Sequence, residues 1–439
     1  MRVVRGIVIG LAVLLLAGVG LYAVSALWPL SAERRAALAV LDRPPPAPGR
    51  NAFAALYLLN HDVPESEWDA LVAADVARYR ALRPGSMDAF AFMPVADPRW
   101  PRLSTRASDS TVSSCDWRKG DCLARVREHR EAFAQWLASQ SVVAGRAAAI
   151  AGYGHYRTPF PPGISAPLPA LQGVSLPLVD AALAFVDGRR EQAMAATCGH
   201  IAGWRPLLAQ SDNLLVSVMA AAQVASGAHL LAQMAAELPP GQALPASCAS
   251  ALRPMQVDEI RVCEPMRGEA RLGWSAMEAA DTEMEGQRLS ALFYDAKRTR
   301  AINAPLMAWS CGDQAGRAIA DDVAAFPPSP PTSLWRLECV SNFIGCALMS
   351  VAAPAYGDYQ LRAQDVAAQL RLTAAAIWLG ENAGSGDEVP AALARLPEAL
   401  RSAARMPSVS SDGRYLQVPA YDKRNLATLQ APLPAHLRR

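Results

Sequence analysis

The sequence has few lysines and no local excess of positive charge. Only Lys119, Lys297 and Lys423 are lysines, so nearly all basic side chains are arginine. Without Arg2 and Arg5, which precede a long apolar run, 40 basic residues (42 minus 2) balance 40 acidic ones. Binding to nucleic acid needs a concentrated positive field. The composition therefore predicts no nucleic-acid partner.

Motifs that carry common enzyme chemistry are also missing. The chain has no G-x-S-x-G, no H-E-x-x-H, no P-loop and no dinucleotide fingerprint of glycines after a strand. Six histidines leave little material for acid and base catalysis. These absences favour a protein without a cofactor and without an assignable catalytic residue.

Cysteines occur without the close pairs that structural zinc sites use, so we expect no metal site. Two pairs share the spacing C-x6-C, in CDWRKGDC (115–122) and CVSNFIGC (339–346). Residues seven apart on one helix lie about 10.5 Å apart along its axis, whereas a disulfide needs Cα atoms within about 7 Å. Loop-forming residues between the cysteines solve this problem, so we predict local disulfides Cys115–Cys122 and Cys339–Cys346. The remaining four, Cys198, Cys248, Cys263 and Cys311, allow three pairings, and the sequence does not choose among them.

The N-terminus carries one long hydrophobic run. Residues 7–28 are apolar and long enough to cross a bilayer as a helix. Arg2 and Arg5 place the N-terminus in the cytoplasm and the rest of the chain in the periplasm. A cleavable signal is the alternative, because Val24-Ser25-Ala26 has the small side chains of a cleavage site. Such a signal has a shorter apolar region, so we favour an uncleaved inner-membrane anchor.

Helical periodicity dominates the rest of the chain. We expect a mainly α fold, in which a transmembrane helix precedes a multi-helix domain. Residues 178–204 resemble a single helical hairpin of the tetratricopeptide kind, with Phe185, Gly188 and Ala193 at the positions of that repeat's aromatic, glycine and alanine residues. A small C-terminal β-hairpin is indicated by Asp412-Gly413 between alternating residues. The expected domains are an anchor (1–30), a juxtamembrane helix and proline-rich linker (31–50), a helical periplasmic domain (51–430) with a subdivision near 325–333, and a tail (431–439).

One aromatic and proline-rich loop, GYGHYRTPFPP (152–162), stands out as a candidate binding site. Long irregular loops inside a compact domain are uncommon and often functional. A ligand there would meet aromatic, histidine and arginine side chains, joined by charges from CEPMRGE (263–269). The alternative is that the aromatic residues only close the end of a helical bundle. The candidate residues are Tyr153, His155, Tyr156, Arg157, Glu264 and Arg267.

Several segments together resemble a known group of proteins. The segments are RPPPAPGRNAFAALYLL, YGHYRTPFPP, CEPMRGE, and PTSLWRLECVSNFIGC before PAYGDY. They resemble uncharacterised single-span, periplasm-facing helical envelope proteins of GC-rich proteobacteria, and the likeness covers nearly the whole chain. The resemblance implies a location and an architecture but no catalytic residue.

Two functions are compatible with these patterns. The first is a non-catalytic binding or scaffold role in the cell envelope, in which the domain contacts another envelope protein. The second is a periplasmic hydrolase whose site is assembled around the 153–160 loop. The two differ in whether His155, Arg157, Glu264 and Arg267 converge on one pocket.

Overall fold

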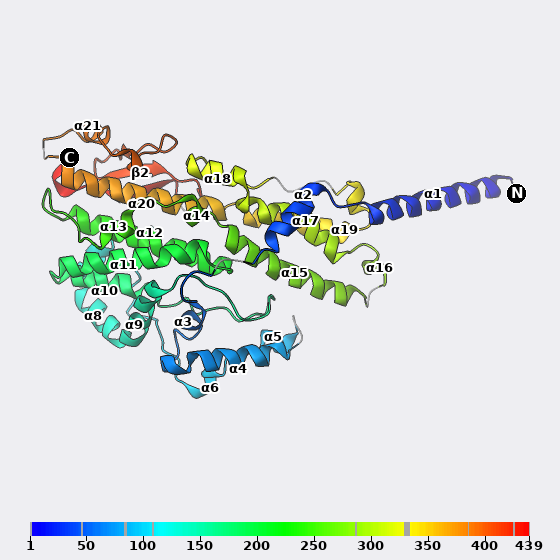
Figure 1. The fold of residues 1–439 in the computed structure, drawn as a ribbon, viewed down its shortest axis with the longest axis horizontal. Coiled ribbons are helices and arrows are strands. Elements are labelled where there is room, and N and C mark those ends of the chain that lie inside the picture. The colour runs from blue at the N-terminus through cyan, green and yellow to red at the C-terminus, as the bar shows by residue number, and fades with distance from the viewer. Residues whose placement is uncertain are drawn as a thin grey trace.

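The computed structural model describes residues 2–438 apart from 45–46, 83–85, 108, 286–287, 329–333, 385 and 425. It is a helical protein with one small antiparallel sheet near the C-terminus, as the sequence predicts (Figure 1). The helices of the first half are α1 (Arg2–Leu27), α2 (Ala32–Leu41), α3 (Phe53–Tyr57), α4 (Trp68–Arg80), α5 (Met87–Phe90), α6 (Ala96–Arg99), α7 (Cys122–Glu128), α8 (Arg130–Ser139), α9 (Ser141–Ala149), α10 (Leu176–Val186), α11 (Arg190–Ala209) and α12 (Leu214–Ala236).

The second half adds shorter helices and the strands. They are α13 (Cys248–Leu252), α14 (Val257–Ile260), α15 (Cys263–Glu285), α16 (Arg288–Ala291), α17 (Ala296–Ala308), α18 (Asp313–Ala320), α19 (Phe343–Ala352), α20 (Tyr359–Asn382), α21 (Val389–Leu393), β1 (Ser408–Val409), β2 (Tyr415–Pro419) and β3 (Thr428–Pro432).

The centre of the domain is a stack of four long helices, α10, α11, α12 and α20, which pack against one another in that order. Gly188 has a φ of 88°, a conformation that glycine adopts without strain, and it makes the sharp turn between α10 and α11. Helix α12 is apolar enough to cross a membrane, but 72% of it is buried, so it is the core helix of this stack. Its N-cap is Asn213, whose side chain accepts a hydrogen bond from the Val216 amide.

The C-terminal sheet packs on α20. Strands run in the order β1-β2-β3, and β2 pairs with β3 in a register that sets Leu416 opposite Ala431. Asp412 and Gly413 lie in the β1–β2 turn, where the sequence indicates a hairpin. The expected domain boundary at 430 falls inside β3. Leu433 and Leu437 are buried in a second hydrophobic core, which α20, α21 and the sheet form, so 431–437 belong to the domain rather than to a tail. The main hydrophobic core includes residues from Ala37 to Ile377 in one continuous cluster. The expected subdivision near 325–333 lies mostly outside the described residues, because 329–333 are not among them.

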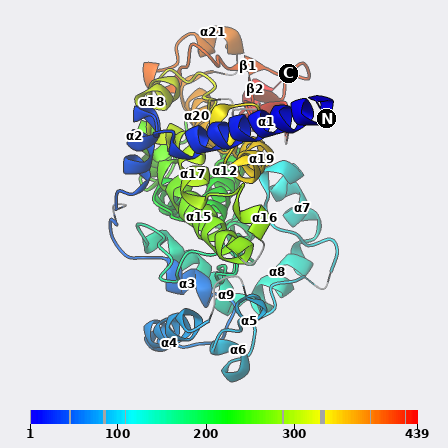
Figure 2. The same cartoon turned by 90° about the vertical axis from the view of Figure 1, so that its right-hand side faces the viewer.

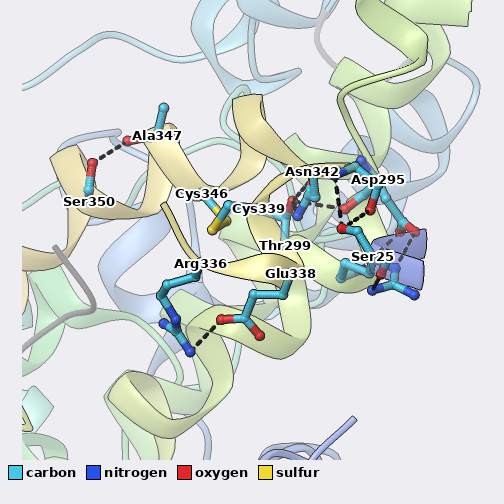
Figure 3. Close-up of a disulfide and its surroundings, with 12 residues drawn as sticks. Ser25, Asp295, Thr299, Arg336, Glu338, Cys339, Asn342, Cys346, Ala347 and Ser350 are labelled. Atoms are coloured by element: carbon cyan, nitrogen blue, oxygen red, sulfur yellow. Dashed lines mark hydrogen bonds and ion pairs between the residues drawn. A yellow bond between two sulfur atoms is a disulfide. The ribbon is translucent and has the colours of Figure 1, made fainter. Parts of the chain in front are cut away.

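Helix α1 projects from the domain (Figures 1 and 2). Its described side chains are almost all exposed. Its last turn is nevertheless held firmly. Ser25 is fully buried, its hydroxyl lies 2.9 Å from that of Ser341, and it accepts a hydrogen bond from the Ser341 amide. Arg298 donates to the carbonyl oxygens of Ser25 and Ala26. We call these contacts the clasp (Figure 3).

The clasp depends on the loop that the disulfide Cys339–Cys346 closes. Asn342, fully buried in this loop, donates to Thr299 and accepts from the Asp295 amide, which ties the loop to the start of α17. Beyond the clasp, Arg34 in α2 makes a two-bond ion pair with Glu338 just before the loop. Helices α1 and α2 are therefore both fixed to the segment 338–342.

All eight cysteines are paired. The structure joins Cys115 to Cys122 and Cys339 to Cys346, the two local pairs that the sequence predicts. It resolves the open question by joining Cys198 to Cys248 and Cys263 to Cys311, across separations of 50 and 48 residues. By chain entropy, closing loops of about 50 residues stabilises a fold by about 4 kcal/mol each, against about 2.5 kcal/mol for a loop of eight.

A buried arginine connects the C-terminal segment to the helices. Arg405 is 1% exposed, donates to Asp365 in α20 at 2.7 Å, and pairs with Asp322 after α18. Its guanidinium also lies 3.9 Å from the centre of the Tyr421 ring. Burial opposes ionisation of Asp322, but the hydrogen bonds and charge of Arg405 lower the pKa of that carboxyl.

We expect Arg405→Met to destabilise the protein strongly. The substitution leaves Asp322 and Asp365 buried without their main cation, and breaking a buried ion pair in this way costs roughly 3–5 kcal/mol. Urea unfolding followed by circular dichroism measures the change. Arg127→Met is the control, because Arg127 makes a half-exposed pair with Glu237, and such pairs contribute roughly 1 kcal/mol or less. If both variants lost the same free energy of unfolding, the buried ion pairs of Arg405 would contribute no more to stability than an exposed pair.

Candidate functional site

The loop predicted as a binding site is mostly packed into the protein. Tyr156 is 1% exposed, and its ring centre lies 5.6 Å from that of Phe53. Tyr153 is 8% exposed and lies under the Arg50 guanidinium. The Nδ1 atom of His155 lies 2.9 Å from the Pro48 carbonyl oxygen. These three side chains close the interface between the N-terminal segment and the helices.

Charged residues do converge beside this loop. Arg157 lies 3.9 Å from Glu264, and Arg267 pairs with the same carboxylate from one turn further along α15. Asp212 accepts hydrogen bonds from the Thr158 amide at 3.2 Å. Burial raises the pKa of Asp212 to about 6, although the Thr158 amide and Arg157 act in the opposite direction. The structure thus brings Arg157, Glu264 and Arg267 together, while His155 is engaged with Pro48.

Helix α15 reaches this cluster because it has a glycine at the contact. A Cβ atom at Gly268 would lie 1.8 Å from the carbonyl oxygen of Asp212. Only a residue without a side chain permits the backbones to approach so closely. Glu264 and Arg267 owe their positions to this contact.

A cleft lies elsewhere, between α12, α20 and the C-terminal sheet. It consists of two adjoining cavities of about 170 Å³ and about 330 Å³. Four residues line both and so mark where they meet: Trp117, Arg118, Gln369 and Leu426. We call the smaller the apolar cavity and the larger the polar cavity, after the side chains that line them.

Aliphatic side chains form most of the apolar cavity. They come from α11, α12, the residue before α15, α20 and the segment around β3: Leu208, Leu214, Val218, Ala221, Ala222, Ala225, Val262, Ala363, Val366, Leu426 and Leu429. One edge is charged, where Arg362 donates to Asp422 at 2.7 Å. Because this pair is internally neutralised, the cavity attracts apolar groups rather than ions.

The polar cavity has a basic lining. Arg414 and Arg438 contribute two positive charges, Arg118 is paired with Asp116 at 3.2 Å, and Asp121 contributes one negative charge. Asp121 caps α7 by accepting from the Ala124 amide. His229 also lines this cavity, and its burial lowers its pKa, so the ring is neutral at pH 7. The lining therefore favours an anionic group.

Polar side chains of α12 and α20 hold the wall between the two cavities in place through hydrogen bonds. Gln233 in α12 accepts hydrogen bonds from the Cys122 and Leu123 amides, and Trp117 donates its amide to Ser226. These bonds fix the disulfide loop 115–122 on α12. In α20, Gln369 is 1% exposed and donates to the Gln430 carbonyl, while its own side-chain oxygen has no hydrogen-bond partner among the described residues. A buried acceptor of this kind is ready for a donor on a ligand.

Sequence reasoning identified the loop CDWRKGDC only as a covalent constraint. Trp117 and Arg118 at its centre are part of the cleft wall, and an aromatic residue beside an arginine was the available signal. The remaining cleft residues come from segments far apart in the chain, and no local pattern joins them.

Neither a metal-binding cluster nor a known relative assigns a function to the site. Among the described residues, no group of three or more histidine, cysteine, aspartate or glutamate side chains could hold a metal ion. No protein-family model, curated protein or solved structure matches the chain. The resemblance to envelope proteins remains a prediction from sequence.

We expect Gly268→Ala to disrupt the charged cluster. The new methyl group meets the Asp212 backbone, and overpacking of this kind costs roughly 1–3 kcal/mol. Gly273→Ala in the same helix is the matched control, since nothing lies within 4 Å of its Cβ position; there alanine stabilises a helix by roughly 0.5–1 kcal/mol. Urea unfolding distinguishes the two, and a neutral Gly268→Ala would contradict the contact.

Proposed function

We propose that this chain is an inner-membrane-anchored protein facing the periplasm, with a non-catalytic role in which its domain binds a small amphipathic anion in the cleft. The observation that carries the proposal is the continuity of an apolar cavity with an arginine-lined one, through a shared wall of four residues.

The location is supported by α1 and by the cysteines. Val3–Leu27 is long and apolar enough to cross a membrane, and no residue of its most apolar stretch is buried in the domain, which buries only Ser25 in the last turn. Four disulfides and no free cysteine suit an oxidising compartment. An uncleaved anchor is favoured over a signal because the clasp uses Ser25 and Ala26, the same residues that resemble a cleavage site.

The chemistry of the ligand follows from the two linings. An alkyl or ring portion of a ligand is stabilised by leaving water for the apolar cavity, at roughly 25 cal/mol per Å². A carboxylate or phosphate attached to it then lies among Arg118, Arg414 and Arg438, where charge-assisted hydrogen bonds are available. A donor group between the two meets the unpaired oxygen of Gln369.

The alternative, a hydrolase around the 153–160 loop, has weaker support. Arg157 and Arg267 both pair with Glu264, and the His155 ring lies within hydrogen-bond distance of the Pro48 carbonyl. The cleft is lined by other residues. A protein partner in the envelope stays a prediction of the sequence.

We expect the full-length protein in lipid nanodiscs to bind octyl phosphate more tightly than octyl glucoside. Isothermal titration calorimetry, with heats from empty nanodiscs subtracted, measures both affinities. Replacing Arg414 and Arg438 by glutamine should weaken octyl phosphate binding by about tenfold or more, because a hydrogen bond to a charged group contributes roughly 1.5–3 kcal/mol. Ala222→Phe should weaken both ligands by filling the apolar cavity.

The control is Arg395→Gln, which removes an exposed arginine that does not line the cleft. It should leave both affinities unchanged. Equal affinities for the two ligands, or equal effects of Arg395→Gln and the Arg414/Arg438 variant, would overturn the proposed site.

A further inference from the structure

The anchor helix α1 contacts the domain at Tyr22, more than one turn before its C-terminal end. The Tyr22 hydroxyl donates to the Leu292 carbonyl at 2.7 Å, and its ring meets Phe293 edge-on with ring centres 6.3 Å apart. Tyr22 precedes Leu27, the last residue of α1, by about 7.5 Å along the helix axis. Part of the domain therefore extends alongside the anchor, toward the membrane.

Helix length sets the depth of that contact. If residues 7–28 are centred in a hydrocarbon core about 30 Å thick, Tyr22 lies about 7 Å from the midplane. If Tyr22 instead occupies the outer interface, which tyrosine side chains prefer, its level is that of the lipid headgroups. At either depth of Tyr22 in the bilayer, its neighbours Leu292 and Phe293 are at the level of the lipid.

The residues at this level form an apolar surface, which we define as Leu292, Phe293 and Phe343. Their exposed fractions are 50%, 42% and 49%, high values for large hydrophobic side chains at adjoining positions. The Ile344 amide donates to the Phe293 carbonyl at 3.0 Å, so the first turn of α19 joins the end of the α16 segment. Helix α19, with sequence FIGCALMSVA, has no charged residue.

Three backbone groups at this surface have hydrogen-bond partners within the protein. The carbonyl oxygens of Leu292 and Phe293 accept from Tyr22 and Ile344, and the Phe293 amide donates to the Ser290 carbonyl. In lipid, an unpaired backbone group costs several kcal/mol. This surface can therefore leave water without leaving those groups unpaired.

We propose that Leu292, Phe293 and Phe343 insert into the outer leaflet of the membrane that α1 spans, so that the domain lies on the bilayer in one orientation. The inference rests on the proposed anchor. Figures 1 and 2 agree with it, since α16 and α19 lie at the end of the domain from which α1 emerges. The clasp is the second fixed point, because it prevents rotation of the domain about the end of α1.

Photo-crosslinking of the full-length protein in phospholipid nanodiscs tests the surface. The photoreactive residue p-benzoyl-phenylalanine replaces Phe293 or Phe343 in separate variants, and mass spectrometry detects adducts with phospholipid. Leu14, in the middle of α1, is the positive control. Val142 is the negative control, since it is 46% exposed in α9, at the opposite end of the domain (Figure 1).

Lipid adducts at positions 14, 293 and 343, with none at 142, are expected. An adduct at 14 with none at 293 or 343 overturns the inserted surface but leaves the anchor intact. Absence of an adduct at 14 overturns the anchor and the inference together. Adducts at 142 as strong as those at 293 would show that contact with lipid is not confined to this surface, which also overturns the inference.

Discussion

The hydrogen bonds between the last turn of α1 and the loop 339–346 determine how the whole domain is placed. A helix that ended in a flexible linker would leave the domain free to turn in any direction. Here Ser25 is buried against Ser341, and Arg298 binds the carbonyl oxygens that the end of the helix leaves without partners. The direction of α1 thus fixes the direction of the domain, with the C-terminal sheet at the end away from the anchor (Figure 1).

Each of the two C-x6-C disulfides constrains one short loop. Cys339–Cys346 constrains the loop that holds the anchor, and Cys115–Cys122 constrains the loop that places Trp117 and Arg118 at the cleft. The longer connections, Cys198–Cys248 and Cys263–Cys311, instead join core helices to their neighbours. The short disulfides here constrain single loops, whereas the long ones connect helices of the core to their neighbours.

Much of the fold can be predicted from sequence, because it follows from local patterns. The apolar run of α1, the turn at Gly188 and the Asp412-Gly413 turn each depend on a few neighbouring residues. The cleft does not, since Gln369, Arg414 and Trp117 meet only through tertiary packing. The candidate residues of the loop 153–160 also lie in different surroundings. Tyr156 is in the core, whereas Arg157 lies near Glu264 only because Gly268 lets α15 approach Asp212. No spacing rule reveals that approach.

The most direct test of the account is the intact mass of the protein purified from membranes without reducing agent. If α1 is an uncleaved anchor, the chain keeps residues 3–27 and is about 8 Da lighter than its reduced form, because each of the four disulfides removes two hydrogens. A chain that begins near Ser25 or Ala26 would contradict the clasped anchor. A mass equal to that of the reduced form would contradict the periplasmic location.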